Sequence, residues 1–274
     1  MNEPESDFSI FNFQFSIPTH PMRRFFFWHL PLAASLAAVA VFGYGFVSYL
    51  RGDTGSPVDF LPRATTAAPA PPRTQLAPVI LGDSLARGAG DERGLGIGGR
   101  LDAELRRRNR PARRTYNIGV SGARTPDLLR QLDSPNVQQM LRDANVIIVS
   151  IGGNDLWGGT DWRNAAPPDP DAVMNDVIAR IETAVERIRA ANPRAHIFFI
   201  GLYNPFVSSP NGRLMTGLVN RWNARLLEHF GSDPDFTLVQ TADLFSHRDR
   251  LALDRFHPGG EAYELIARRI ADGV

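Results

Sequence analysis

The chain has 274 residues, a formal net charge of +1 at neutral pH and no cysteine. A nearly balanced charge gives no electrostatic case for nucleic-acid binding. The absence of cysteine excludes disulfides, thiolate metal sites and cysteine nucleophiles. The length is sufficient for one large domain with accessory segments.

The N-terminal part predicts a membrane anchor. Residues 1–24 are polar to mixed, and we expect this tail to be poorly ordered. Residues 25–50 carry no charged side chain, and the stretch from Pro31 to Leu50 would span about 30 Å as a helix, the thickness of a bilayer core. We therefore predict a single transmembrane helix at 25–50. A cleaved signal peptide is the alternative, although the apolar run is longer than a usual signal-peptide core and no clear cleavage site follows it.

The arginines around this span are almost equally distributed between its two ends. Arg23 and Arg24 precede it directly, and a globular segment follows it, which favours a cytoplasmic N-terminus. We predict a bacterial inner-membrane protein with a periplasmic domain, or a secreted one if the segment is cleaved. Residues 51–77 are rich in Pro and Ala, a composition typical of a semi-rigid linker that holds the domain 78–274 away from the bilayer.

From residue 78 onward, apolar runs alternate with amphipathic segments. The apolar runs predict strands at 79–81, 116–120, 146–151, 197–202 and 236–239. The amphipathic segments predict helices at 101–109, 171–191, 214–230 and 262–270. Such alternation implies right-handed crossovers, so we predict an α/β domain with a parallel sheet and helices on both faces.

Four short polar stretches follow these strands or precede the last helix. They are Gly82-Asp83-Ser84-Leu85 and the ranges 117–122, 152–155 and 254–258. Because the carboxyl ends of parallel strands meet at one edge of a sheet, we expect the four stretches to lie together.

The residue types in these stretches suit nucleophilic catalysis. Ser84 is a candidate nucleophile, and a serine hydroxyl needs a base to take its proton. His257 can be that base, and Asp254 is close enough in sequence to accept the other imidazole N–H. The backbone N–H groups of Ser84 and Gly122 and the side-chain amide of Asn154 are candidate donors to an oxyanion.

Taken together and in this order, the four stretches resemble the motif blocks of the SGNH (GDSL-type) hydrolase family. The stretch 88–91, Gly-Ala-Gly-Asp, is most similar to the bacterial lipase/acylhydrolase members. The resemblance covers residues 78–274. It implies a flavodoxin-like three-layer α/β/α fold with about five parallel strands. It also implies hydrolysis of an ester or thioester through an acyl-enzyme, without a metal or other cofactor.

The resemblance carries over to single residues. It implies that Ser84 is the nucleophile and that Asp254 and His257 complete a catalytic triad. It implies oxyanion donors at Gly122 and Asn154. All five positions hold the residue type that the family uses.

Each of these motifs is weak when taken alone, and rival residues exist. Ser121 lies in a sequence similar to a nucleophile elbow, but the final glycine is missing, and a turn residue is the simpler interpretation. Asp243 follows a strand and competes with Asp254 as the orienting acid, although a cap is simpler. The loops 156–170 and 202–210 carry aromatic side chains that suit an acyl chain, but no substrate-binding residue is assigned.

We therefore predict a membrane-anchored serine esterase of the lipase or acylhydrolase type. Its expected partners are a small-molecule or lipid ester substrate and the membrane, and no nucleic acid. One alternative uses the same site to transfer an acyl group to an envelope carbohydrate, as an O-acyltransferase does. A non-catalytic binding module is the alternative from another class.

Overall fold

The computed structural model describes residues 21–50, 75–157, 169–246 and 248–274. Most of the predicted tail (1–24) and of the predicted linker (51–77) lies outside the described residues. The chain divides into two compact units, Met1–Pro69 and Ala70–Val274.

The described part of the first unit is one long helix, α1 (Pro21–Leu50). Within it, the 19 residues His29–Val47 have a mean hydropathy of 1.9, and no part of this span is buried. The helix is therefore long and apolar enough to cross a membrane, a property that N-terminal signal sequences share. It begins four residues earlier than the predicted span 25–50.

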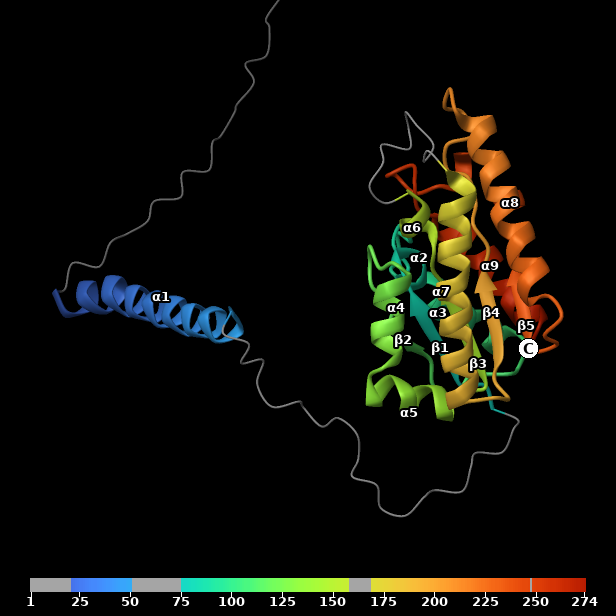
Figure 1. Ribbon diagram of the computed structural model, residues 1–274. Helices are drawn as coiled ribbons and strands as arrows, with labels where there is room; N and C mark the ends of the chain where they lie inside the picture. Colours follow the sequence, from blue (N-terminus) through green and yellow to red (C-terminus); the bar gives the residue numbers. More distant parts are fainter. Residues whose placement is uncertain (1–20, 51–74, 158–168, 247) are drawn as a thin grey trace, which may run out of the picture. The chain divides into compact units, whose positions relative to one another are not determined.

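The second unit contains a five-stranded parallel sheet (Figure 1). Its strands are β1 (Pro78–Gly82), β2 (Tyr116–Asn117), β3 (Val146–Ser150), β4 (His196–Ile200) and β5 (Phe236–Val239), in the spatial order β2-β1-β3-β4-β5. The chain leaves β1 toward β2 on one side and returns to β3 on the other. The carboxyl ends of β1 and β3 therefore flank the point where the strand order reverses, which is where open α/β sheets bind their ligands.

Helices connect the strands and cover both faces of the sheet (Figure 1). They are α2 (Ser84–Arg87), α3 (Gly96–Arg107), α4 (Thr125–Leu132), α5 (Pro135–Asp143), α6 (Gly153–Trp157), α7 (Pro170–Ala191), α8 (Gly212–Phe230) and α9 (Gly260–Asp272), with two 3-10 turns at Ala242–Phe245 and Arg248–Arg250. The predicted three-layer α/β/α fold with five parallel strands is confirmed.

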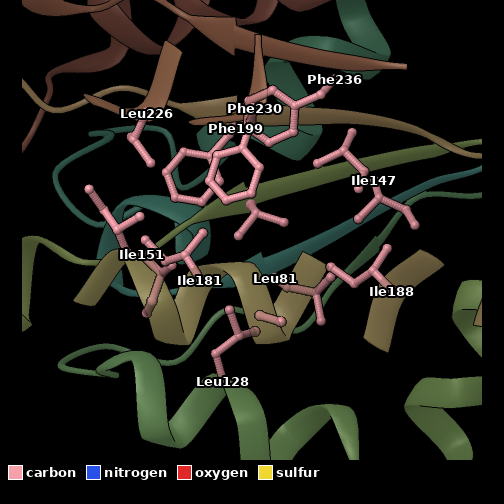
Figure 2. Close-up of a cluster of buried hydrophobic side chains, with 14 of the residues drawn as sticks. Leu81, Leu128, Ile147, Ile151, Ile181, Ile188, Phe199, Leu226, Phe230 and Phe236 are labelled. Atoms are coloured by element: carbon pink, nitrogen blue, oxygen red, sulfur yellow. The ribbon is translucent and has the colours of Figure 1, made fainter. Parts of the chain in front are cut away.

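The sheet separates two hydrophobic cores, because side chains alternate between its faces. Val79 and Leu81 of β1 pack with α4, α5, α7 and α8, whereas Ile80 packs with α3 and α9. Figure 2 shows the first core, in which side chains from the sheet such as Leu81 and Phe199 lie among those of the covering helices. Every residue of β1 and β3 is buried, so these two central strands give the site a rigid base.

The main departure from the predicted elements is at β2. The apolar run 116–120 predicts a five-residue strand, but β2 ends at Asn117. There the side chain of Asn117 accepts a hydrogen bond from Gly119 N (3.0 Å) and donates one to the carbonyl of Ala86 (2.8 Å). These two bonds hold the backbone after Asn117 against the segment of Ser84, while Ile118 N still donates to Ile80 O of β1 (2.9 Å). The helices α2, α4, α5 and α6 are too short to show a helical repeat and were not predicted.

Candidate active site

The turn after β1 positions Ser84 at the first residue of α2. Gly82 has a φ of +123°, and a Cβ at this position would collide with the carbonyl oxygen of Ser150 at the end of β3. Asp83 N donates to that same oxygen (2.9 Å), and the Asp83 carboxylate accepts from Leu85 N (3.0 Å). A glycine and a capping aspartate thus hold a sharp turn between a buried strand and a one-turn helix.

Ser84, His257 and Asp254 form one continuous hydrogen-bonded chain. The Ser84 Oγ lies 2.9 Å from His257 Nε2, and His257 Nδ1 lies 2.6 Å from Asp254 Oδ2. The two contacts use the two nitrogens of one imidazole ring. Such an arrangement allows the ring to accept a proton from the serine while the carboxylate fixes its tautomer.

A local turn builds the Asp254 side of this chain. The Asp254 Oδ1 accepts hydrogen bonds from the backbone N–H groups of Phe256 and His257, each at 2.9 Å. Arg255, which directly follows Asp254, has a φ of +56°, and Ala252 N donates to His257 O (2.8 Å) to close the turn. Burial raises the pKa of Asp254, but the hydrogen bonds from the imidazole and the two N–H groups outweigh it and hold that pKa below its ordinary value.

The candidate oxyanion donors lie directly after three strands: Ser84 begins α2 after β1, Gly122 lies in the loop after β2, and Asn154 lies in α6 after β3. Val120 N donates to Gly82 O (2.8 Å), which ties the loop after β2 to the nucleophile turn. Gly122 follows with a φ of +81°. Within the described part of the chain, the backbone N–H groups of Ser84 and Gly122 have no hydrogen-bond partner. Both are therefore available to a substrate oxygen.

Asn154 joins the same group through its side chain. Its Nδ2 donates to the carbonyl of Ala123, the residue after Gly122, at 2.9 Å. A side-chain amide carries two hydrogens, so one can anchor Asn154 to the neighbouring loop while the other points elsewhere. The structure thus brings all five of the predicted site residues to one edge of the sheet.

A buried carboxyl group, that of Asp83, directly precedes Ser84. Asp83 is 7% exposed, and its Oδ1 also accepts a hydrogen bond from the Ser150 hydroxyl (3.0 Å). Burial raises the pKa of Asp83 to about 6, against the lowering effect of the Ser150 hydroxyl, the Leu85 and Ala86 N–H groups and His257. Sequence reasoning assigned no role to this residue, and the only available signal was its place in the Gly-Asp-Ser-Leu motif.

The rival residues are accounted for differently. Asp243 is paired with Arg269 through two short contacts, one of 2.8 Å, so its carboxylate is occupied away from His257. Ser121 is exposed, and no hydrogen bond links it to an imidazole within the described residues. Within the described residues, an imidazole thus lies within hydrogen-bond distance of the hydroxyl of Ser84 and not of that of Ser121. The described residues also hold no group of three or more His, Asp or Glu side chains placed to bind a metal ion.

The two loops whose aromatic side chains suit an acyl chain are described to different extents. Residues 158–168 of the loop 156–170 lie outside the described residues. In the loop 202–210, Tyr203 is buried, stacks on Phe245 (ring centroids 3.9 Å apart) and donates through its hydroxyl to Phe256 O (2.7 Å). Tyr203 therefore supports the turn that carries His257 instead of contributing an open apolar wall.

One hollow of about 260 Å³ adjoins the Gly122 loop. Residues 120–123 form one wall, and the other wall consists of Asp127, Leu128 and Gln131 on α4. Polar and apolar groups both line it. Its position beside Gly122 makes it a place where part of a substrate can lie.

Comparison with known proteins gives a consistent result. A family model for the GDSL-like Lipase/Acylhydrolase family matches residues 80–265. YpmR of Bacillus subtilis (strain 168), an uncharacterized protein, is 29% identical over 203 residues, which are 71% of this chain and 79% of YpmR. The spore germination lipase LipC of Bacillus licheniformis is 25% identical over 201 residues, which are 69% of this chain and 92% of LipC.

A solved structure shares the fold. The lipase Lip_vut3 from a goat rumen metagenome matches with a TM-score of 0.62 and 24% sequence identity, over 72% of this chain and 97% of that one. The family match spans more than half of the chain and includes all five candidate site residues. The chain therefore belongs to the GDSL-like lipase/acylhydrolase family and is an ester-hydrolysing enzyme.

Proposed function

We propose that this chain is a membrane-anchored serine esterase in which Ser84 is the nucleophile. The observation that carries the proposal is the continuous chain of hydrogen bonds from Asp254 through His257 to Ser84, with lengths of 2.6 and 2.9 Å. A serine hydroxyl is a weak nucleophile unless a base lies within hydrogen-bond reach, and His257 lies there.

In the acylation step, the Ser84 Oγ attacks the ester carbonyl carbon as its proton passes to His257 Nε2. The carbonyl oxygen becomes an oxyanion, which the N–H groups of Ser84 and Gly122 and the Asn154 amide stabilise by hydrogen bonds. His257 then gives the proton to the alcohol oxygen as the carbon–oxygen bond breaks. Asp254 holds the imidazole in place and stabilises its positive charge throughout.

In the deacylation step, a water molecule attacks the acyl-enzyme. It loses one proton to His257 as its oxygen bonds to the acyl carbon. The same donors hold the second oxyanion. Ser84 leaves as the acid forms and regains its proton from His257, so the site returns to its starting state.

Membrane anchoring by α1 is the second part of the proposal. Its span His29–Val47 presents large apolar side chains without protein cover, which a bilayer would satisfy. The paired arginines before the span favour a cytoplasmic N-terminus and an extracytoplasmic esterase domain. Retention of the full chain in membranes washed with alkaline carbonate supports an anchor, and release of a shortened chain supports signal cleavage.

The proposed substrate is a carboxylic or thio ester with a lipid-type or short acyl group. The likeness to LipC and Lip_vut3, both named lipases, supports an acyl ester. The test is hydrolysis of p-nitrophenyl acetate, octanoate and palmitate by the full-length protein in detergent, with Ser84→Ala as the control. We expect turnover of at least one ester that disappears in the variant.

The products separate the remaining possibilities. Free acid in stoichiometric yield supports hydrolysis, and acyl product on an added carbohydrate supports an O-acyltransferase. Equal turnover by Ser84→Ala and the parent would contradict the nucleophile. A folded protein inactive on all three esters would contradict the esterase proposal.

A further inference from the structure

Two parallel connections join the segments that carry the candidate oxyanion donors Gly122 and Asn154. The first is the hydrogen bond from Asn154 Nδ2 to Ala123 O described above. The second lies one residue further along α6, where the Asp155 carboxylate accepts hydrogen bonds from Thr125 N at 2.9 and 3.1 Å and from the Thr125 hydroxyl at 2.7 Å. The spacing between the segment of Gly122 and that of Asn154 is therefore fixed at two points, Ala123 and Thr125.

A third element reaches this second connection. Arg180 of α7 donates from its Nε to the Thr125 hydroxyl oxygen (2.7 Å), and one of its terminal nitrogens lies 3.8 Å from Asp155 Oδ1. Its other terminal nitrogen pairs with Asp176 (2.6 Å) on the same helix. Arg180 thus connects α7 to the start of α4 and to α6 at a single point.

The chemistry of this contact requires all three side chains. The Asp155 side chain is only 5% exposed, so its charge depends on hydrogen bonds and on a nearby cation. Thr125 is 1% exposed. Its hydroxyl donates a hydrogen bond to the Asp155 carboxylate and accepts one from the Arg180 guanidinium. These two bonds use the hydroxyl's one hydrogen and one of its two lone pairs. Without Arg180, a buried carboxylate and a buried hydroxyl would each lose a partner.

We propose that Arg180 is a positioning residue for the oxyanion hole. It touches neither the nucleophile nor the place of the substrate oxygen. It acts through Thr125 and Asp155 to hold the segments of Gly122 and Asn154 at the separation that an oxyanion needs. This inference rests on the proposed function, because it assigns Gly122 and Asn154 the role of donors.

The proposal has a specific kinetic consequence. Oxyanion donors act on charge that develops in the transition state, so a loosened hole reduces kcat more than it changes KM. Removal of one donor typically costs about 10²–10³ in kcat, and a residue that only positions donors should cost less, about 5- to 30-fold. A general loss of folded protein would instead lower the number of active sites without changing turnover per site.

The chain supplies a matched control on the same helix. Arg187, two turns after Arg180 on α7, also reaches α4, where it donates to Leu129 O (3.0 Å) and pairs with Asp133 (2.6 Å). Its side chain is 38% exposed, against 31% for Arg180. Both arginines therefore fasten α7 to α4, but only Arg180 contacts the link between the donor segments.

The experiment compares Arg180→Met and Arg187→Met in the full-length protein. Turnover of the best p-nitrophenyl ester is expressed per active site, counted by titration with a fluorophosphonate. Binding of phenylboronic acid is measured in parallel, because boron adds to a serine oxygen and becomes a negatively charged tetrahedral mimic of the intermediate. We expect Arg180→Met to lose 5- to 30-fold in kcat and a similar factor in boronate affinity, with KM within about twofold. Arg187→Met should match the parent.

Thr125 provides an independent check on the same link. Thr125→Ser keeps the hydroxyl between Asp155 and Arg180, and Thr125→Val removes it with little change in shape. We expect the serine variant to keep kcat and the valine variant to lose it to about the same extent as Arg180→Met.

The outcomes separate this inference from the function on which it rests. A parent enzyme without Ser84-dependent turnover would overturn both. An active parent with equal kcat and boronate affinity in Arg180→Met and Arg187→Met would overturn only the positioning role. A loss in Arg180→Met that appears entirely as fewer titrated sites would also overturn it.

Discussion

The two halves of the candidate site are held in contrasting ways. The half that we propose transfers protons, Asp254 and His257, lies within one turn whose bonds span two or three residues. The oxyanion half is joined by side chains that span about 30 residues between the donor segments and 55 residues from α7. One half is set by local backbone geometry, and the other depends on packing of distant elements.

Exposure follows the same division. The Asp254 side chain is 47% exposed, whereas that of Asp155 is 5% exposed. Water can partly compensate for changes around Asp254, but not for a lost partner at Asp155. Substitutions in the first half should therefore act on chemistry alone, and those in the second half should also affect stability.

The largest effect is expected from Asp254→Asn. The amide can still accept the two backbone hydrogen bonds, but it no longer provides a carboxylate to orient His257 and to stabilise its charge. Loss of this function in serine triads costs about 10³–10⁴ in kcat, and we expect that range with little change in Tm.

The matched control for that prediction is Asp243→Asn. This residue competed with Asp254 in the sequence, and it pairs with Arg269 in the structure. Its kcat should stay within about twofold of the parent. A large loss in Asp243→Asn with an active Asp254→Asn would reverse the assignment of the orienting acid.

The next effect in size is expected from Asn154→Ala. It removes a proposed oxyanion donor together with the bond to Ala123, so we expect kcat to fall by about 10²–10³ with a smaller change in KM. Asn145→Ala is the control, because Asn145 lies at the opposite end of β3, where its side-chain oxygen accepts a hydrogen bond from Ala77 N (2.7 Å). Equal kcat values for the two variants would contradict the assignment of Asn154 as an oxyanion donor.

The smallest effect is expected from Asp83→Asn, and it concerns stability. Asp83 connects the nucleophile turn to Ser150 on β3, between the two halves. The pKa of its carboxyl is raised to about 6 by burial, so the folded state favours the protonated form. As the pH rises from about 4 through 6, ionisation should destabilise the parent by roughly 1–3 kcal/mol relative to the asparagine variant.

Urea unfolding of both proteins at pH 4 and pH 7.5 measures this double difference. The free energy of unfolding of Asp83→Asn minus that of the parent should be larger at pH 7.5 than at pH 4. A difference that does not change with pH would mean that Asp83 ionises without cost in the folded protein.

The sequence predicted the fold class well because β1, β3 and β4 are continuous apolar runs with clear ends. It overestimated β2, since the turn there is made by the side chain of Asn117 and not by a break in hydrophobicity. The short helices α2, α4, α5 and α6 carry too few residues to show a helical period. Their positions are decided by tertiary packing.

The site was predictable where its bonds are local or its motif is distinctive. Asp254 and His257 are three residues apart, so their contact follows from one turn. The roles of Asp155, Thr125 and Arg180 could not be predicted, because no spacing in the sequence relates a residue of α7 to the end of β3. Tyr203 was interpreted as part of an aromatic loop beside the substrate, and only the fold places its hydroxyl against Phe256 O.

The most direct test of the central claim is covalent labelling of the full-length protein with a fluorophosphonate, followed by peptide mass spectrometry. Phosphonylation requires a serine oxygen that is activated by a base, so it reports the nucleophile without knowledge of the natural substrate. The account predicts one adduct, on Ser84, that is absent in Ser84→Ala and strongly slowed in His257→Ala. An adduct on Ser121, or no adduct on the folded parent, would contradict it.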